Sequence, residues 1–218
     1  MKTILPLALL LWAVLLPGPV QGQGLALGAR AGSLGLGGEA AYGLSETLTV
    51  RGGFGVFPFE YDGEFEEEEY TVSLPTSIWS VGLDLYPGGG PIRLMGGFIG
   101  RSGDIEVEST FSGEREVGDT EYTSSGTLLG TLDQGSVAPF LGLGFGRHTG
   151  GGFGFFLDLG VAFTGEPDVT ITPSGPIASE PGIQEALREE EDTIQDEAGA
   201  YLEYWPILSL GIKVPVGG

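Results

Sequence analysis

The sequence contains no cysteine and a single histidine, His148. Without cysteine the chain forms no disulfide bond, offers no thiol nucleophile and lacks the acylated cysteine of a bacterial lipoprotein. One histidine also excludes a histidine-rich metal site, because such a site needs several ligands close together. Since His148 stands in the segment RHTGGG, which we interpret as a turn, we expect it to be a polar turn residue and not part of a catalytic group.

Positive charge is scarce as well. Lys and Arg number 9 against 30 Asp and Glu, which gives a formal net charge of −21. A chain this acidic is not expected to bind nucleic acid, because that binding depends on basic side chains that contact phosphates. High net charge can cause disorder, but 41% of the residues are hydrophobic, and this favours a folded domain.

Long hydrophobic runs are missing apart from one near the start of the chain. There, Lys2 precedes the apolar run 7–16, and prolines and small residues follow, a pattern typical of a secretory signal peptide. The run is shorter than the about 20 residues that a membrane-spanning helix needs. We predict a signal peptide over 1–22, cleaved after Gly22, and an exported domain over 23–218. The alternative is a retained N-terminal anchor.

What the chain does have is glycine, with 41 residues, and strict alternation of residue size. In the segment 153–163, FGFFLDLGVAF, the odd positions are large and apolar, whereas most even positions are small and one is Asp158. A period of two is that of a β-strand. The same alternation occurs in segments 48–56, 81–85, 137–145 and 208–214.

Segments of this kind predict about eight strands, and their connectors alternate in length. Three connectors are short turns, and the three that alternate with them are long acidic loops. Outer-membrane barrels place short turns in the periplasm and long loops outside the cell. We therefore predict an all-β fold, a closed antiparallel up-and-down transmembrane β-barrel. The strands are expected near 24–32, 34–44, 47–59, 69–86, 91–108, 126–147, 152–172 and 201–214, with short turns at 45–46, 87–90 and 148–151, a tight turn at 32–33, and long loops at 60–69, 103–125 and 173–200.

The last long loop is expected to contain one short helix. Pro181 suits a first helical position, and Ser179 or Glu180 precedes it as a possible cap. Five apolar or aromatic side chains share one face, and acidic residues occupy the others. They are Ile183, Leu187, Ile194, Ala198 and Tyr201. The alternative is a solvated, partly ordered loop.

The faces opposite the apolar ones carry charges of both signs. Five are basic and three acidic, a near balance in a chain that is otherwise strongly acidic, and glycines beside them leave room for long side chains. Because an eight-stranded barrel is just wide enough to be filled by side chains, we predict a structural ion-pair network in its lumen. Its members are Arg30, Glu39, Arg51, Asp84, Arg93, Arg101, Asp158 and Lys213. On a soluble β-sandwich these faces would instead point to water and the Leu, Phe and Val faces would form the core.

Four strands carry a resemblance to a known group of proteins. VGLDLYP (81–87), APFLGLGFG (138–146), GFFLDLGVAF (154–163) and WPILSLGIKV (205–214) resemble the strands of the small bacterial outer-membrane barrels of the OmpA/OmpX type and the related OmpW-like families. The resemblance implies an eight-stranded barrel in the outer membrane of a Gram-negative bacterium. The chain departs from it by ending in VPVGG (214–218), because such barrels usually end in an aromatic residue that the insertion machinery recognises.

Two further patterns suggest sites less strongly. Gly142, Gly144 and Gly146 form a GxGxG string, but a strand pattern runs through it, so we interpret the glycines as inward-facing barrel positions and not as a dinucleotide site. An acidic run is a weak candidate for binding Ca²⁺ or Mg²⁺, but it lacks the spacing of an EF-hand loop, and we prefer to interpret it as a solvated loop tip. Its members are Glu64, Glu66, Glu67, Glu68 and Glu69.

The sequence thus predicts a non-catalytic barrel with a structural or surface-binding role and no cofactor. Its expected partners are outer-membrane lipid and the barrel-insertion machinery, and a monomer is expected. One alternative is an OmpW-like conduit or binder for small apolar molecules, which needs an open lumen or a lateral opening. Another is a soluble periplasmic barrel that binds an apolar ligand between inward-facing Leu and Phe side chains.

Overall fold

The computed structural model describes residues 24–58, 61–65, 68–149 and 152–216. The predicted signal peptide lies outside these residues. Within them, no helix is both long enough and apolar enough to cross a membrane.

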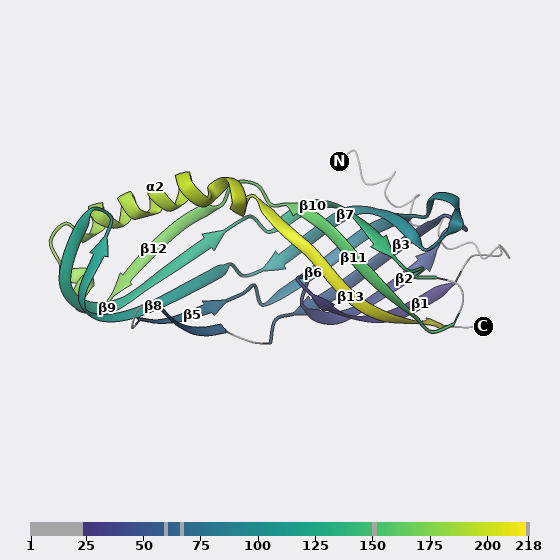
Figure 1. Cartoon of the computed structure of the whole chain (residues 1–218), viewed down its shortest axis with the longest axis horizontal. Helices are drawn as coiled ribbons and strands as arrows, with labels where there is room; N and C mark the ends of the chain where they lie inside the picture. Colours follow the sequence, from purple (N-terminus) through teal and green to yellow (C-terminus); the bar gives the residue numbers. More distant parts are fainter. Residues whose placement is uncertain (1–23, 59–60, 66–67, 150–151, 217–218) are drawn as a thin grey trace, which may run out of the picture.

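Eight strands form a closed antiparallel barrel, which confirms the predicted fold class (Figure 1). Each expected segment contains one barrel strand, and consecutive barrel strands pair with one another around the circle. The first and last strands close it, from the pair Leu25–Val216 to the pair Gly32–Ser209. The strands are β1 (Leu25–Gly32), β2 (Leu36–Gly43), β3 (Leu48–Val56), β6 (Ser77–Leu85), β7 (Ile92–Ser102), β10 (Val137–Phe145), β11 (Gly154–Phe163) and β13 (Tyr204–Val216).

The two ends of the barrel differ. One end carries the short connectors β2–β3, β6–β7 and β10–β11 and both ends of the described chain, and we call it the turn end (Figure 1). The β6–β7 connector is a 3-10 turn, η1 (Pro87–Gly89), in which Gly88 and Gly89 have φ values of 72° and 70° that favour glycine. The opposite end, the sheet end, carries all the long excursions of the chain.

These excursions form a second sheet of five strands in the order β12-β9-β8-β5-β4. The prediction that segments 60–69 and 103–125 are loops was therefore wrong, because both contain strands. Beyond the predicted strand end at 108, β8 continues to alternate, with Phe111 and Val117 buried and the acids Glu114 and Glu116 exposed on the solvated face of the strand. The strands are β4 (Tyr61–Phe65), β5 (Glu68–Ser73), β8 (Ile105–Val117), β9 (Thr120–Asp133) and β12 (Asp168–Ser174).

One helix, α2 (Ile183–Leu202), lies along this sheet, after a short 3-10 turn, η2 (Pro176–Ser179) (Figure 1). A helix in the last excursion is confirmed, but it is not short, because it has 20 residues. Its first turns bury Ile183 and Leu187 against the sheet, where a core forms with Phe111, Val117 and Tyr122. Ile194 is half-buried, and the side chains of the other two residues expected on this face, at 198 and 201, lie outside the described part of the chain.

The barrel turns its large apolar side chains outward. Leu141 is 61% exposed, Phe155 is 65% exposed and Leu210 is 61% exposed, whereas Arg51 and Asp158 inside are 8% and 2% exposed. This is the arrangement of a barrel whose exterior faces hydrocarbon, and it is the opposite of a soluble sandwich with an apolar core.

Candidate functional site

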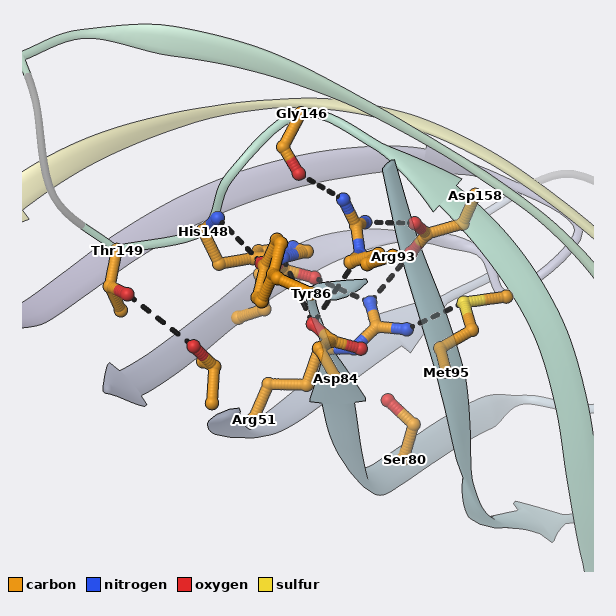
Figure 2. A network of polar contacts seen from close by, with 12 residues as sticks. Arg51, Ser80, Asp84, Tyr86, Arg93, Met95, Gly146, His148, Thr149 and Asp158 are labelled. Atoms are coloured by element: carbon orange, nitrogen blue, oxygen red, sulfur yellow. Dashed lines mark hydrogen bonds and ion pairs between the residues drawn. The ribbon is translucent and has the colours of Figure 1, made fainter. Parts of the chain in front are cut away.

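Buried charges gather in the turn-end half of the barrel (Figure 2). Each comes from a strand position that alternates with outward apolar neighbours, so the pleat of the strand turns the charged side chain into the lumen. The predicted network members found here are Arg30 on β1, Glu39 on β2, Arg51 on β3, Asp84 on β6, Arg93 on β7 and Asp158 on β11.

Two arginines and two aspartates alternate in a closed ring, the Arg–Asp ring, made of Arg51, Asp84, Arg93 and Asp158. Arg51 Nη1 donates to Asp158 Oδ2 at 2.6 Å, and its Nε lies 3.1 Å from Asp84 Oδ1. Arg93 Nη2 donates to Asp158 Oδ1, and its Nε lies 3.4 Å from Asp84 Oδ2. Each buried charge therefore has an opposite charge on both sides, which offsets the large cost of removing it from water.

Glu39 and Arg30 extend the ring toward the first two strands. Glu39 Oε2 lies 3.8 Å from Arg51 Nη1 and 4.0 Å from Arg30 Nη1. Arg30 Nη1 also donates to Ser80 Oγ at 3.1 Å. Six barrel strands, β1, β2, β3, β6, β7 and β11, are linked by these contacts and those of the ring.

His148 lies in the β10–β11 turn as predicted, but its side chain belongs to the same buried cluster, which the prediction did not include. It follows β10 in the chain, but its ring points inward and is 1% exposed. Nε2 lies 2.6 Å from Glu39 Oε1 and Nδ1 lies 3.1 Å from Asp84 Oδ2, and the ring centroid is 4.6 Å from that of Phe156. Because a connector has no period, the sequence carries no signal for the direction of this side chain.

Tyr86 holds the connector of His148 in place. The backbone N–H of His148 donates to Tyr86 Oη at 3.1 Å, and Arg147 lies over the Tyr86 ring at 5.0 Å from its centroid. Burial raises the pKa of the Tyr86 phenol above its ordinary value. The cluster is thus closed at the turn end by a neutral, buried aromatic ring.

Glycines leave room for the long side chains. A Cβ atom at Gly144 would lie 2.5 Å from the Arg93 guanidinium, and one at Gly53 would lie 2.9 Å from that of Arg30. Strand β10 runs through Gly142 and Gly144, and the Gly146 carbonyl just after it accepts a hydrogen bond from Arg93. The GxGxG string is therefore part of the lumen wall, as its strand pattern indicates.

Two of the eight predicted members stand apart. Arg101 lies at the sheet end, where it donates to Gln134 Oε1 at 2.6 Å and lies over the Trp205 ring at 5.5 Å from its centroid. Lys213 is buried near the turn end, in register with Gly154 of β11. The structure therefore brings six of the predicted residues together with His148, and places two at other levels of the barrel.

The sheet-end half of the lumen is apolar, a feature that the sequence prediction missed. Its side chains share the inward face with the charged ones, and they form one packed cluster. The buried members are Leu34, Ile78, Met95, Ile99, Ala138, Phe140, Ala162, Trp205 and Ile207. The lumen is thus filled by an apolar layer toward the sheet end and a charged layer toward the turn end.

The acidic run considered as a cation site divides between two strands. Glu64 lies on β4, Glu68 and Glu69 lie on β5, and Glu64 pairs with Glu69 in register. Residues 66 and 67 lie outside the described residues. Among the residues that the structure does describe, no group of three or more His, Asp or Glu side chains is placed to hold a metal ion.

A closed eight-stranded antiparallel barrel with apolar side chains outside and charges inside has the fold of the small outer-membrane barrels. The crystal structure of Acinetobacter baumannii CarO2 superposes with a TM-score of 0.66 and 15% sequence identity over 90% of this chain and 100% of CarO2. That of Acinetobacter baumannii CarO gives 0.62 and 15% over 91% of this chain and 99% of CarO. No protein-family model matches the chain, and no curated protein matches it in sequence.

Proposed function

We propose that this chain is a non-catalytic outer-membrane barrel whose excursions act at the cell surface, in a structural or ligand-binding role. The observation that carries the proposal is the outward belt of Leu, Phe, Val and Ile side chains, many of which are 40–65% exposed. Such a surface is unfavourable in water, because soluble proteins rarely expose large continuous apolar patches, but it suits a hydrocarbon environment. The shared fold with the CarO structures supports the same location.

The charge distribution supports the surface role of the sheet end. Segments 57–76, 103–136 and 164–203, which make up the excursions, hold 26 of the 30 Asp and Glu but only 2 of the 9 Lys and Arg. With the start of the mature domain in the periplasm, the short turns lie inside and this acidic part lies outside the cell. Export by the signal peptide over 1–22, insertion by the barrel-insertion machinery and a monomeric state complete the proposal.

We expect the expressed chain to sediment with the outer membrane and to migrate faster on a detergent gel before boiling than after it. The reason is that a closed barrel resists detergent until heat breaks its strand pairing. Fractionation followed by gels with and without boiling measures both properties. Recovery of the mature chain in the soluble periplasmic fraction, without detergent, would contradict the proposal.

The two packed layers of the lumen argue for a plug instead of a conduit. We therefore expect no stepwise ion conductance when the purified protein is inserted in a planar bilayer, because Phe140 and Trp205 close one level and the Arg–Asp ring closes the other. An open porin in the same bilayer serves as the positive control. Reproducible current steps from the wild-type protein, changed in size by Arg51→Ala or Arg93→Ala, would favour the conduit alternative.

A further inference from the structure

A cavity of about 430 Å³ lies between α2 and the five-stranded sheet, away from the lumen. Its walls are mainly aliphatic and come from β5, β8, β9, β12 and α2, with some polar and charged side chains among them. The side chains that define it are Val107, Leu132, Val169, Ile171, Ile194 and Leu202. Its volume is within the range of sites that bind small organic molecules.

The cavity exists because the helix packs closely on the sheet over only part of its length. Toward the first turns of α2, Ile183 and Leu187 fill the space above Phe111 and Val117. Farther along, Ile194 and Leu202 stay half-buried, and Val107 opposite them is 39% exposed. At this end the space is open to solvent and forms a half-open groove with a mainly apolar lining, and a concave apolar surface of this kind suits an apolar guest.

A glycine forms the floor. Gly130 of β9 pairs with Val107 of β8 on one side and with Ile171 of β12 on the other. The two neighbouring strands therefore contribute side chains to the cavity at this level, and β9 contributes none. A Cβ atom at Gly130 would meet only the Val107 carbonyl, at 3.7 Å, which is ordinary contact. The backbone therefore tolerates a side chain at this position, and glycine there leaves the space open.

The helix that roofs the cavity is fixed by its own carboxylates. The Gly118 N–H donates to Glu190 Oε2 at 3.1 Å, and the Ile171 N–H donates to Glu191 Oε1 at 2.6 Å. The first contact ties α2 to the β8–β9 turn and the second ties it to the edge of β12. The cavity is thus a preformed feature and not a gap beside a loosely placed helix.

The charge of the residues around the cavity determines which ligand charge is favoured. The excursions that surround it hold 26 acidic and 2 basic residues, and Glu116 and Glu190 line the cavity itself beside Arg115. A potential this negative repels anions and concentrates cations at the entrance. We propose that the cavity under α2 is a surface binding site for a small hydrophobic cation, an organic ammonium compound with an aromatic or aliphatic body. This inference rests on the proposed surface location for the ligand's access.

The test uses the full mature protein in lipid nanodiscs and three probes of one shape: 4-phenylbutylamine, 4-phenylbutanol and 4-phenylbutyrate. Binding is measured by titration calorimetry, with empty nanodiscs as the blank. We expect saturable binding of the amine, at least tenfold tighter than that of the carboxylate, because the body is the same and only the charge differs. Equal binding of amine and carboxylate would overturn the cation preference, and no saturable binding of any probe would overturn the site.

Two variants fill the cavity from opposite sides, Gly130→Leu from the sheet and Ile194→Trp from the helix. Each is expected to weaken amine binding at least tenfold. Gly52→Leu is the matched control, since a Cβ atom at Gly52 meets only the Ser80 carbonyl, also at 3.7 Å, in a barrel strand remote from the cavity. Undiminished binding by a filled variant that still migrates as a folded barrel would overturn the proposal. Calorimetry uses purified protein, so a negative binding result would count against this site alone. The outer-membrane location is tested separately, by fractionation.

Discussion

Asp158→Ala is expected to destabilise the barrel by about 3–5 kcal/mol, the cost of leaving buried charges without their partner. Asp158 accepts hydrogen bonds from both Arg51 and Arg93, which are 8% and 0% exposed. Without this carboxylate, Arg93 keeps only Asp84 and Arg51 keeps Asp84 and the more distant Glu39, at 3.8 Å, so the lumen there has a net positive charge. Equilibrium unfolding of the vesicle-inserted protein in urea, followed by tryptophan fluorescence at neutral pH, measures the loss.

Ser209→Ala is the matched control for this experiment. Ser209 pairs with Asp158 in register on β13 and is 1% exposed, but it carries no charge. Its replacement removes a buried polar atom of similar position and is expected to change the free energy of unfolding by far less than Asp158→Ala. If both variants unfolded at the same urea concentration as the wild type, the Arg–Asp ring would have no structural role.

Leu159→Arg is expected to make folding into a bilayer less favourable by about 2–4 kcal/mol, the cost of an arginine on the lipid face near the middle of a membrane. Leu159 lies at the centre of β11, is 50% exposed, and stands between Leu143 and Leu208 of the neighbouring strands. An arginine there would face hydrocarbon or distort the surrounding lipid. Refolding into vesicles of defined lipid from urea measures the effect.

The comparison for this variant is Thr170→Arg on β12. Thr170 is exposed on β12, in the sheet beyond the barrel, and an arginine there remains in water. We expect wild-type folding from it. Equal folding of Leu159→Arg and Thr170→Arg, in vesicles and in plain buffer alike, would mean that the belt of β11 does not contact lipid.

The barrel was predictable because its strands combine a period of two with a large contrast between their faces. In β11, Leu159 and Phe163 alternate with Asp158 and Gly160, and lipid outside and charge inside require this contrast. Where the contrast disappears, the prediction fails. Phe140 points inward and Leu141 outward, both large and apolar, so the sequence does not show that the sheet-end half of the lumen is an apolar layer.

The second sheet was missed for a different physical reason. Its strands have one solvated face, and in the part of β8 beyond the predicted strand end at 108 that face carries Glu114 and Glu116, so this part was assigned to an acidic loop. The position of His148 depends on the path of a connector, which tertiary contacts with Tyr86 and Glu39 determine and local sequence does not.

The length of the β8–β9 hairpin determines how far the second sheet extends beyond the barrel. Strand β8 has 13 residues and β9 has 14, and β8 alone, at about 3.3 Å per residue, extends roughly 40 Å. The two strands pair along nearly their whole length and α2 packs against them, so the hairpin is a rigid extension and not a flexible linker. In the proposed orientation, a partner bound at its tip would be held at a fixed distance from the membrane surface.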